Sequence, residues 1–122
     1  MDQMFIYHIA NKCGFNAQRV AGKYSVASLE SEGFIHCCGN ESDLLEVANH
    51  LFHSSQDLIV IRIATNALEA AVRWESAPGD PNVNRVFPHI YGSINMEAVD
   101  GMHELEIDGS GYFVGLGSRQ IR

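Results

Sequence analysis

Helix-like patterns in this chain are confined to the first half, whereas strand-like patterns continue toward the end. Helices are expected from Asn11 to about Lys23, over Ser28–Gly33, and from Ser42 or Asp43 through Phe52. Runs rich in β-branched and aromatic residues predict strands at Met4–Ala10, Phe34–Cys38, Asp57–Ala64, Ala71–Glu75, His89–Ile94 and Val99–Ile107. Because regular β-α-β alternation is missing, the expected fold class is α+β with a mixed or antiparallel sheet.

The length of 122 residues predicts one domain over residues 1–122. A net charge of −7 argues against nucleic acid as a partner, since affinity for phosphate backbones needs clustered Lys and Arg. No apolar run approaches the roughly 20 residues of a membrane helix, so no membrane partner is expected. The start does not resemble a signal peptide, and three cysteines make a poor disulfide framework. We therefore expect a cytoplasmic protein.

Two histidines lie in the middle of predicted strands among apolar neighbours. In Phe34–Cys38, His36 shares a face with Phe34 and Cys38, and His8 is placed similarly in Met4–Ala10. If the two strands are close, both imidazoles can face one cleft. Neutral imidazole both donates and accepts hydrogen bonds, which suits ribose hydroxyls or a carboxamide. The alternative is that each is a core histidine bonded to a backbone carbonyl.

Aromatic and acidic residues flank the irregular loop at residues 77–88. Trp74 or Tyr91 can stack on a flat base, and Glu75 is a candidate for stabilising positive charge that develops during a reaction. Pro88 constrains the turn that directs His89. Core aromatics with a solvated glutamate are the alternative.

Cysteine nucleophiles and metal ligands are weaker candidates. Cys37 points away from His36 in a regular strand, and Cys38 lies about 7 Å along it, too far for direct proton transfer. His50 and His53 are three residues apart on one helix, and adjacent cysteines lack the usual ligand spacing. No metal is expected.

The chain resembles the domain of unknown function 952 family. Order, spacing and residue type agree in five segments: Ile6–Ile9, Tyr24–Leu29, Glu32–Cys37, Val72–Glu75 and Phe87–Gly92. The sequence departs from the family in having Cys38 where serine is frequent and Phe15 where tryptophan is common.

This resemblance implies a compact ADP-ribosyltransferase-like fold, a split α+β sheet with two to three helices. In that superfamily a histidine on the first strand binds the nicotinamide ribose of NAD, and His8 occupies the matching strand. A second motif residue follows a short helix, as His36 does. The expected catalytic residues are His36 and Glu75, and the expected NAD-binding residues are His8, Ser28, His36, Trp74, His89 and Tyr91.

The sequence thus predicts a small nucleotide-like ligand, NAD or a related ribonucleotide, in a histidine-lined cleft. If the protein is an enzyme, an ADP-ribosyltransferase-like transferase or an NAD glycohydrolase is expected. The main alternative is a non-catalytic module that recognises a small metabolite or a modified nucleotide. A partner-binding domain without a ligand pocket is a third interpretation.

Overall fold

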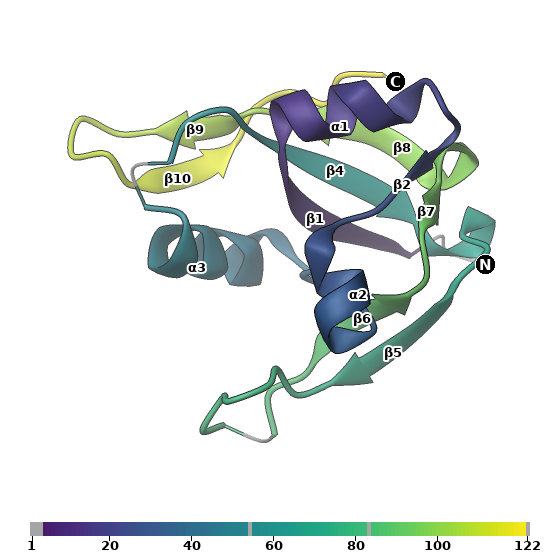
Figure 1. The fold of residues 1–122 in the computed structure, drawn as a ribbon. Coiled ribbons are helices and arrows are strands. Elements are labelled where there is room, and N and C mark those ends of the chain that lie inside the picture. The colour runs from purple at the N-terminus through teal and green to yellow at the C-terminus, as the bar shows by residue number, and fades with distance from the viewer. Residues whose placement is uncertain (1–3, 54, 83, 122) are drawn as a thin grey trace.

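The structure is a computed structural model, and it describes residues 4–53, 55–82 and 84–121. Short strands alternate with three α-helices in the first half, and strands continue through the second half (Figure 1). The elements are β1 (Phe5–Asn11), α1 (Lys12–Arg19), β2 (Lys23–Tyr24), α2 (Ala27–Glu32), β3 (Ile35–His36), α3 (Glu41–Leu51), β4 (Leu58–Ala64), β5 (Ala71–Glu75), β6 (Phe87–Tyr91), β7 (Ile94–Asn95), β8 (Val99–His103), β9 (Leu105–Ile107) and β10 (Phe113–Leu116), with 3₁₀ turns at Thr65–Ala67 and Met96–Ala98.

The described strands pair antiparallel throughout. Two sheets have three strands each, in the orders β1-β4-β8 and β3-β6-β5, and two pairs, β2-β7 and β9-β10, complete the set. Reciprocal backbone hydrogen bonds between Tyr7 and Cys38, of 2.8 and 2.7 Å, connect β1 to the segment after β3. The predicted α+β class with antiparallel pairing is confirmed.

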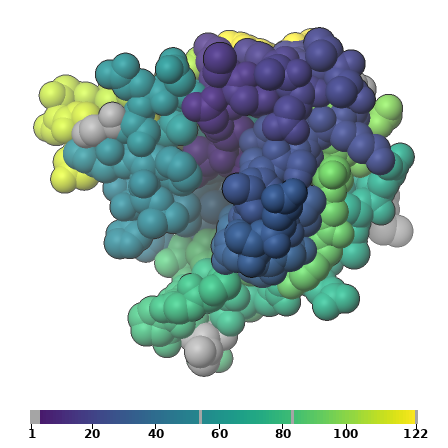
Figure 2. All heavy atoms as spheres, viewed as in Figure 1, coloured from purple at the N-terminus to yellow at the C-terminus, as the bar shows by residue number. Residues whose placement is uncertain are grey.

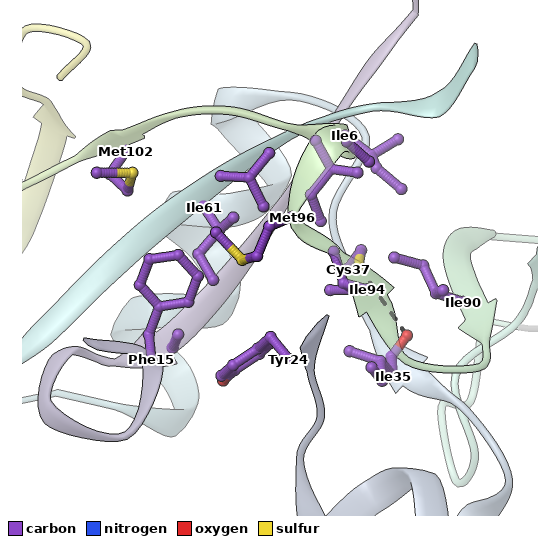
Figure 3. Close-up of a cluster of buried hydrophobic side chains, with 14 of the residues drawn as sticks. Ile6, Phe15, Tyr24, Ile35, Cys37, Ile61, Ile90, Ile94, Met96 and Met102 are labelled. Carbon is purple, nitrogen blue, oxygen red and sulfur yellow. Dashed lines mark hydrogen bonds between the residues drawn. The ribbon is translucent and has the colours of Figure 1, made fainter. Parts of the chain in front are cut away.

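The main core gathers side chains from both three-stranded sheets (Figure 3). In β1, Ile6, His8 and Ala10 are buried while the alternate residues are only partly so, as strand periodicity predicts. Across the pairing, Ile61 and Ile63 of β4 are fully buried. Figure 3 shows the same cluster reaching across six further elements through Phe15, Tyr24, Ile35, Ile90, Ile94 and Met102.

Several helix boundaries differ from the sequence-based expectation. Asn11 caps α1 as predicted, its side chain accepting from the Gly14 N–H at 2.8 Å. The helix ends at Arg19 rather than near Lys23, because residues 23–24 pair with β7 instead. The cap of α3 is Asn40, not Ser42 or Asp43, since the Asn40 side chain accepts from the Asp43 N–H.

The short helix α2 begins at Ala27, so Ser28 lies inside it rather than opening it. Gly33 ends the helix as predicted, with a φ of 89° that favours glycine. The next strand, β3, is shorter than the predicted Phe34–Cys38 because its ladder to β6 covers Ile35 and His36, and Cys38 pairs with β1 instead.

The bounds of two later strands also differ from the sequence-based expectation. β6 spans residues 87–91 rather than 89–94, since Pro88 lies within the strand and its carbonyl accepts from the Cys37 N–H at 3.1 Å. The predicted strand 99–107 divides at Glu104 into β8, which pairs with β4, and β9, which pairs with β10.

Candidate functional site

A cleft of about 540 Å³ opens where β1, β3 and β6 meet, and Figure 2 shows the surface hollowed between α2 and α3. Most of its wall is apolar, and its residues come from β1, from the segment around β3, from β6, from both helices and from the loop before β6. Four candidate binding residues from the sequence line it together: His8, Ser28, His36 and His89. Tyr7, Tyr24 and Glu32 also line it, and sequence reasoning did not select them individually.

His8 is fixed in one neutral form. Its Nδ1–H donates to the backbone carbonyl of His36 at 2.7 Å, because a carbonyl oxygen can only accept. Nε2 is therefore free of a proton and accepts from the Tyr24 hydroxyl at 3.4 Å. Burial lowers the pKa of His8 to about 4, and burial raises the pKa of Tyr24 to about 12. His8 is thus both a core histidine bonded to a carbonyl and a residue of the cleft wall.

His36 lies at the exposed edge of the same site. Its side chain is 44% exposed, and its Nε2 lies 2.9 Å from a carboxylate oxygen of Glu32, one turn earlier at the end of α2. In the β3–β6 ladder His36 pairs directly with His89, and the two ring centroids are 5.3 Å apart. The antiparallel pairing therefore brings together two histidines that are far apart in the sequence.

His89 is held by a carboxylate behind the cleft. Its Nδ1 lies 3.0 Å from Oε1 of Glu75, and the Tyr91 hydroxyl donates to the same oxygen. The hydrogen bond from Tyr91 lowers the pKa of Glu75 most, and the one from His89 lowers it further. The carboxylate is therefore charged at neutral pH. Since a carboxylate only accepts, the proton of neutral His89 lies on Nδ1 and leaves Nε2 as an acceptor. Phe34 stacks on this imidazole at 4.1 Å.

Two polar atoms of the cleft wall are buried without a partner among the described residues. They are Oγ of Ser28 and Nε2 of His89, whose residue is 1% exposed. A buried polar atom with no hydrogen bond costs about 1–3 kcal/mol, so such atoms call for an explanation. The residues that carry these atoms line the cleft, so a bound molecule that comes within hydrogen-bond distance of them would supply the missing bonds.

Three of the predicted site residues do not line the cleft. Trp74 is 45% exposed and lies against Gly39, where a Cβ would come within 2.6 Å of the indole. Glu75 and Tyr91 reach the cleft only through His89, as described above. Trp74 and Glu75 therefore lie outside the lining of the cleft.

The cysteines of this region are unsuited to act as thiolates. Burial raises the pKa of Cys38 to about 12 and raises that of Cys37 well above its ordinary value. Among the described residues no group of three or more His, Cys, Asp and Glu side chains is arranged to hold a metal ion. Over the same residues, no helix is long and apolar enough to cross a membrane.

Solved structures of a bacterial protein share this fold. The X-ray crystal structure of protein CC0527 from Caulobacter crescentus is 23% identical, with a TM-score of 0.76 over 90% of this chain and 93% of that chain. The solution NMR structure of CC0527, also 23% identical, gives a TM-score of 0.70 over 88% of this chain and 90% of that chain. Likeness at this level of identity establishes the fold alone.

The comparison with curated proteins gives no significant match. The family described as "Protein of unknown function (DUF952)" matches residues 9–102. That range includes Ser28, His36 and His89, and His8 lies one residue before it. The match covers well over half of the sequence and contains four of the five segments on which the resemblance rested, together with the end of the first: the chain belongs to the DUF952 family.

Proposed function

We propose that the cleft binds NAD or a related ribonucleotide. The observation that carries this proposal is the pair of buried, unpartnered polar atoms, Ser28 Oγ and His89 Nε2, in a mostly apolar cleft of about 540 Å³. Ligand sites commonly combine apolar walls with a few placed polar groups. A ribose supplies hydroxyls for the polar atoms, and a flat base suits the apolar wall.

The proposal includes an ADP-ribosyltransferase-like fold. Its support is the separation of the sheet into two parts joined at Tyr7 and Cys38, which places His8 beside the β3 strand that carries His36. A cytoplasmic location is also part of the proposal, because the three cysteines are free thiols, as expected in a reducing compartment.

If the protein is catalytic, a transferase or NAD glycohydrolase reaction fits this ligand. The bond from the ribose carbon to nicotinamide would break, and water or an acceptor hydroxyl would attack the oxocarbenium-like carbon. His36, at the mouth, is the candidate that touches the ligand. Glu75 would act through His89, as a positioning residue rather than a catalytic one.

The placement of Glu75 favours a second candidate, a binding module without catalysis. Its carboxylate is engaged by His89 and Tyr91 outside the cleft wall, so it does not face a developing positive charge. A module of this kind would recognise a small metabolite or a modified nucleotide through the same Ser28 and His89 groups.

Calorimetric titration with NAD, ADP-ribose and nicotinamide tests the proposal. We expect saturable binding by the wild-type protein. His89→Asn keeps an N–H near the Nδ1 position for Glu75 but removes Nε2, so the loss of one ligand hydrogen bond should weaken binding by about 1–3 kcal/mol, roughly ten- to a hundredfold. His36→Ala keeps the backbone carbonyl that accepts from the His8 Nδ1–H. It therefore tests the contribution of the His36 imidazole to binding.

The matched control is His103→Asn. His103 is also buried and its Nδ1–H donates to a carbonyl, that of Gly117 at 2.8 Å, but it does not line the cleft. This variant should bind like the wild type. No saturable binding of any of the three ligands would contradict the proposed function. Release of free nicotinamide from NAD would distinguish the enzyme from the binding module.

A further inference from the structure

We propose that the cleft recognises the uncharged, hydroxyl-bearing nucleoside part of its ligand and makes no favourable contact with phosphate. This inference rests on the proposed function and narrows its ligand class. It follows from the charge of the cleft wall and from the direction of the hydrogen bonds that the wall can form.

The cleft wall offers no cation of the kind that binds phosphate. None of its described lining residues is Lys or Arg, whereas phosphate sites in proteins usually present those side chains or ordered backbone donors. The charged residue in the lining is Glu32, whose carboxylate lies beside His36. A phosphate in this space would meet a like charge, in a chain whose net charge is −7.

Six basic side chains of the described chain already make contacts outside the cleft wall, and Lys23, which precedes the lining residue Tyr24, is exposed to solvent. Four of them form ion pairs outside the cleft: Lys12 with Glu104, Arg62 and Arg119 with Asp100, and Arg85 with Asp43 and Glu46. Arg19 lies over the Phe15 ring and Arg73 over the Tyr91 ring. Moving one of these cations to a bound phosphate would break an existing contact.

The unpartnered groups of the wall include one that can only accept. Glu75 keeps the proton of neutral His89 on Nδ1, so His89 Nε2 is an acceptor without a donor. His8 Nε2 already accepts from the Tyr24 hydroxyl. Ser28 Oγ can donate or accept. A ligand hydroxyl or amide brings the proton that His89 Nε2 needs, whereas a phosphate dianion brings none.

Paired titrations separate the two kinds of ligand. Adenosine is compared with AMP, and guanosine with GMP, each at low and high salt. Within each pair the base and ribose are the same, and one phosphate differs. We expect each nucleoside to bind at least as tightly as its 5′-monophosphate, with little dependence on salt.

Variants of two serines on α2 test whether the Ser28 hydroxyl binds the nucleoside. Ser28→Ala removes the unpartnered hydroxyl and should weaken nucleoside binding about tenfold. Ser31→Ala, an exposed serine of the same helix, should leave it unchanged. Equal affinities of the two variants for adenosine would overturn the assignment of Ser28.

The outcomes distinguish this inference from the function on which it depends. Monophosphates that bind several-fold more tightly than their nucleosides, with an affinity that falls as salt rises, would overturn the inference and leave ribonucleotide binding in place. Absence of saturable binding by all four probes would overturn both.

Discussion

The buried imidazole of His8 should make the stability of this fold sensitive to acid. Its pKa is about 4 in the folded chain against an ordinary value of 6.5. As the pH falls, the unfolded chain therefore takes up the proton first. Stability is unaffected by His8 above about pH 6.5, decreases as the pH falls from there toward 4, and shows the full loss below that value.

The size of the effect follows from these two pKa values. Between pH 7 and pH 4.5, proton linkage predicts that His8 removes about 2 kcal/mol from the free energy of unfolding. This is a large fraction of the roughly 5–15 kcal/mol that stabilises a typical domain. Other groups titrate in the same range, so the effect must be read as a difference between variants.

The variant His8→Asn provides that difference. Asparagine can keep an N–H near the position of Nδ1 and donate to the His36 carbonyl, but it cannot take up a proton. Urea unfolding at several pH values should show the wild type losing about 2 kcal/mol more than His8→Asn between pH 7 and 4.5. His50→Asn, at an exposed position of α3, should follow the wild type. Parallel curves for the wild type and His8→Asn would refute the reasoning.

Three further predictions concern the thiols, a turn and the core. In the native protein at pH 8, iodoacetamide should modify the exposed Cys13 and spare Cys37 and Cys38, whose pKa values are raised by burial; mass spectrometry of the intact chain would show one adduct, and three adducts would contradict this. Gly33→Ala should cost about 1 kcal/mol because of its φ of 89°, and an unchanged urea midpoint would argue against that strain. Ile61→Ala, at a fully buried position opposite β1, should cost about 2–5 kcal/mol in the same assay, and a loss below about 1 kcal/mol would contradict its place in the core.

The regular strands could be predicted because their sequence patterns are strong. Alternating burial in β1 and the bounds of β5 agree with the sequence-based expectation. The predicted bounds of β6 are wrong because proline is typical of loops, which places Pro88 before the expected strand. The strand includes it, since a proline lacks an N–H but keeps a carbonyl that accepts from Cys37.

The candidate site could be predicted only in part. The mid-strand positions of His8 and His36 pointed to a shared cleft, and the structure places both in its wall. Trp74 and Glu75 have suitable chemical types, but β5 is an edge strand that β6 separates from β3, and no local pattern reveals that strand order. The unpartnered Ser28 hydroxyl likewise results from the packing of α2, and not from a motif.

The most direct test of the central claim is the side-chain nitrogen NMR signal of His89 during a titration with adenosine. The account predicts an unprotonated Nε2 in the free protein, shifted in a saturable manner as adenosine is added, while the signals of His103 stay constant. Saturable binding of adenosine that leaves the His89 signals unchanged, or no binding at all, would contradict it.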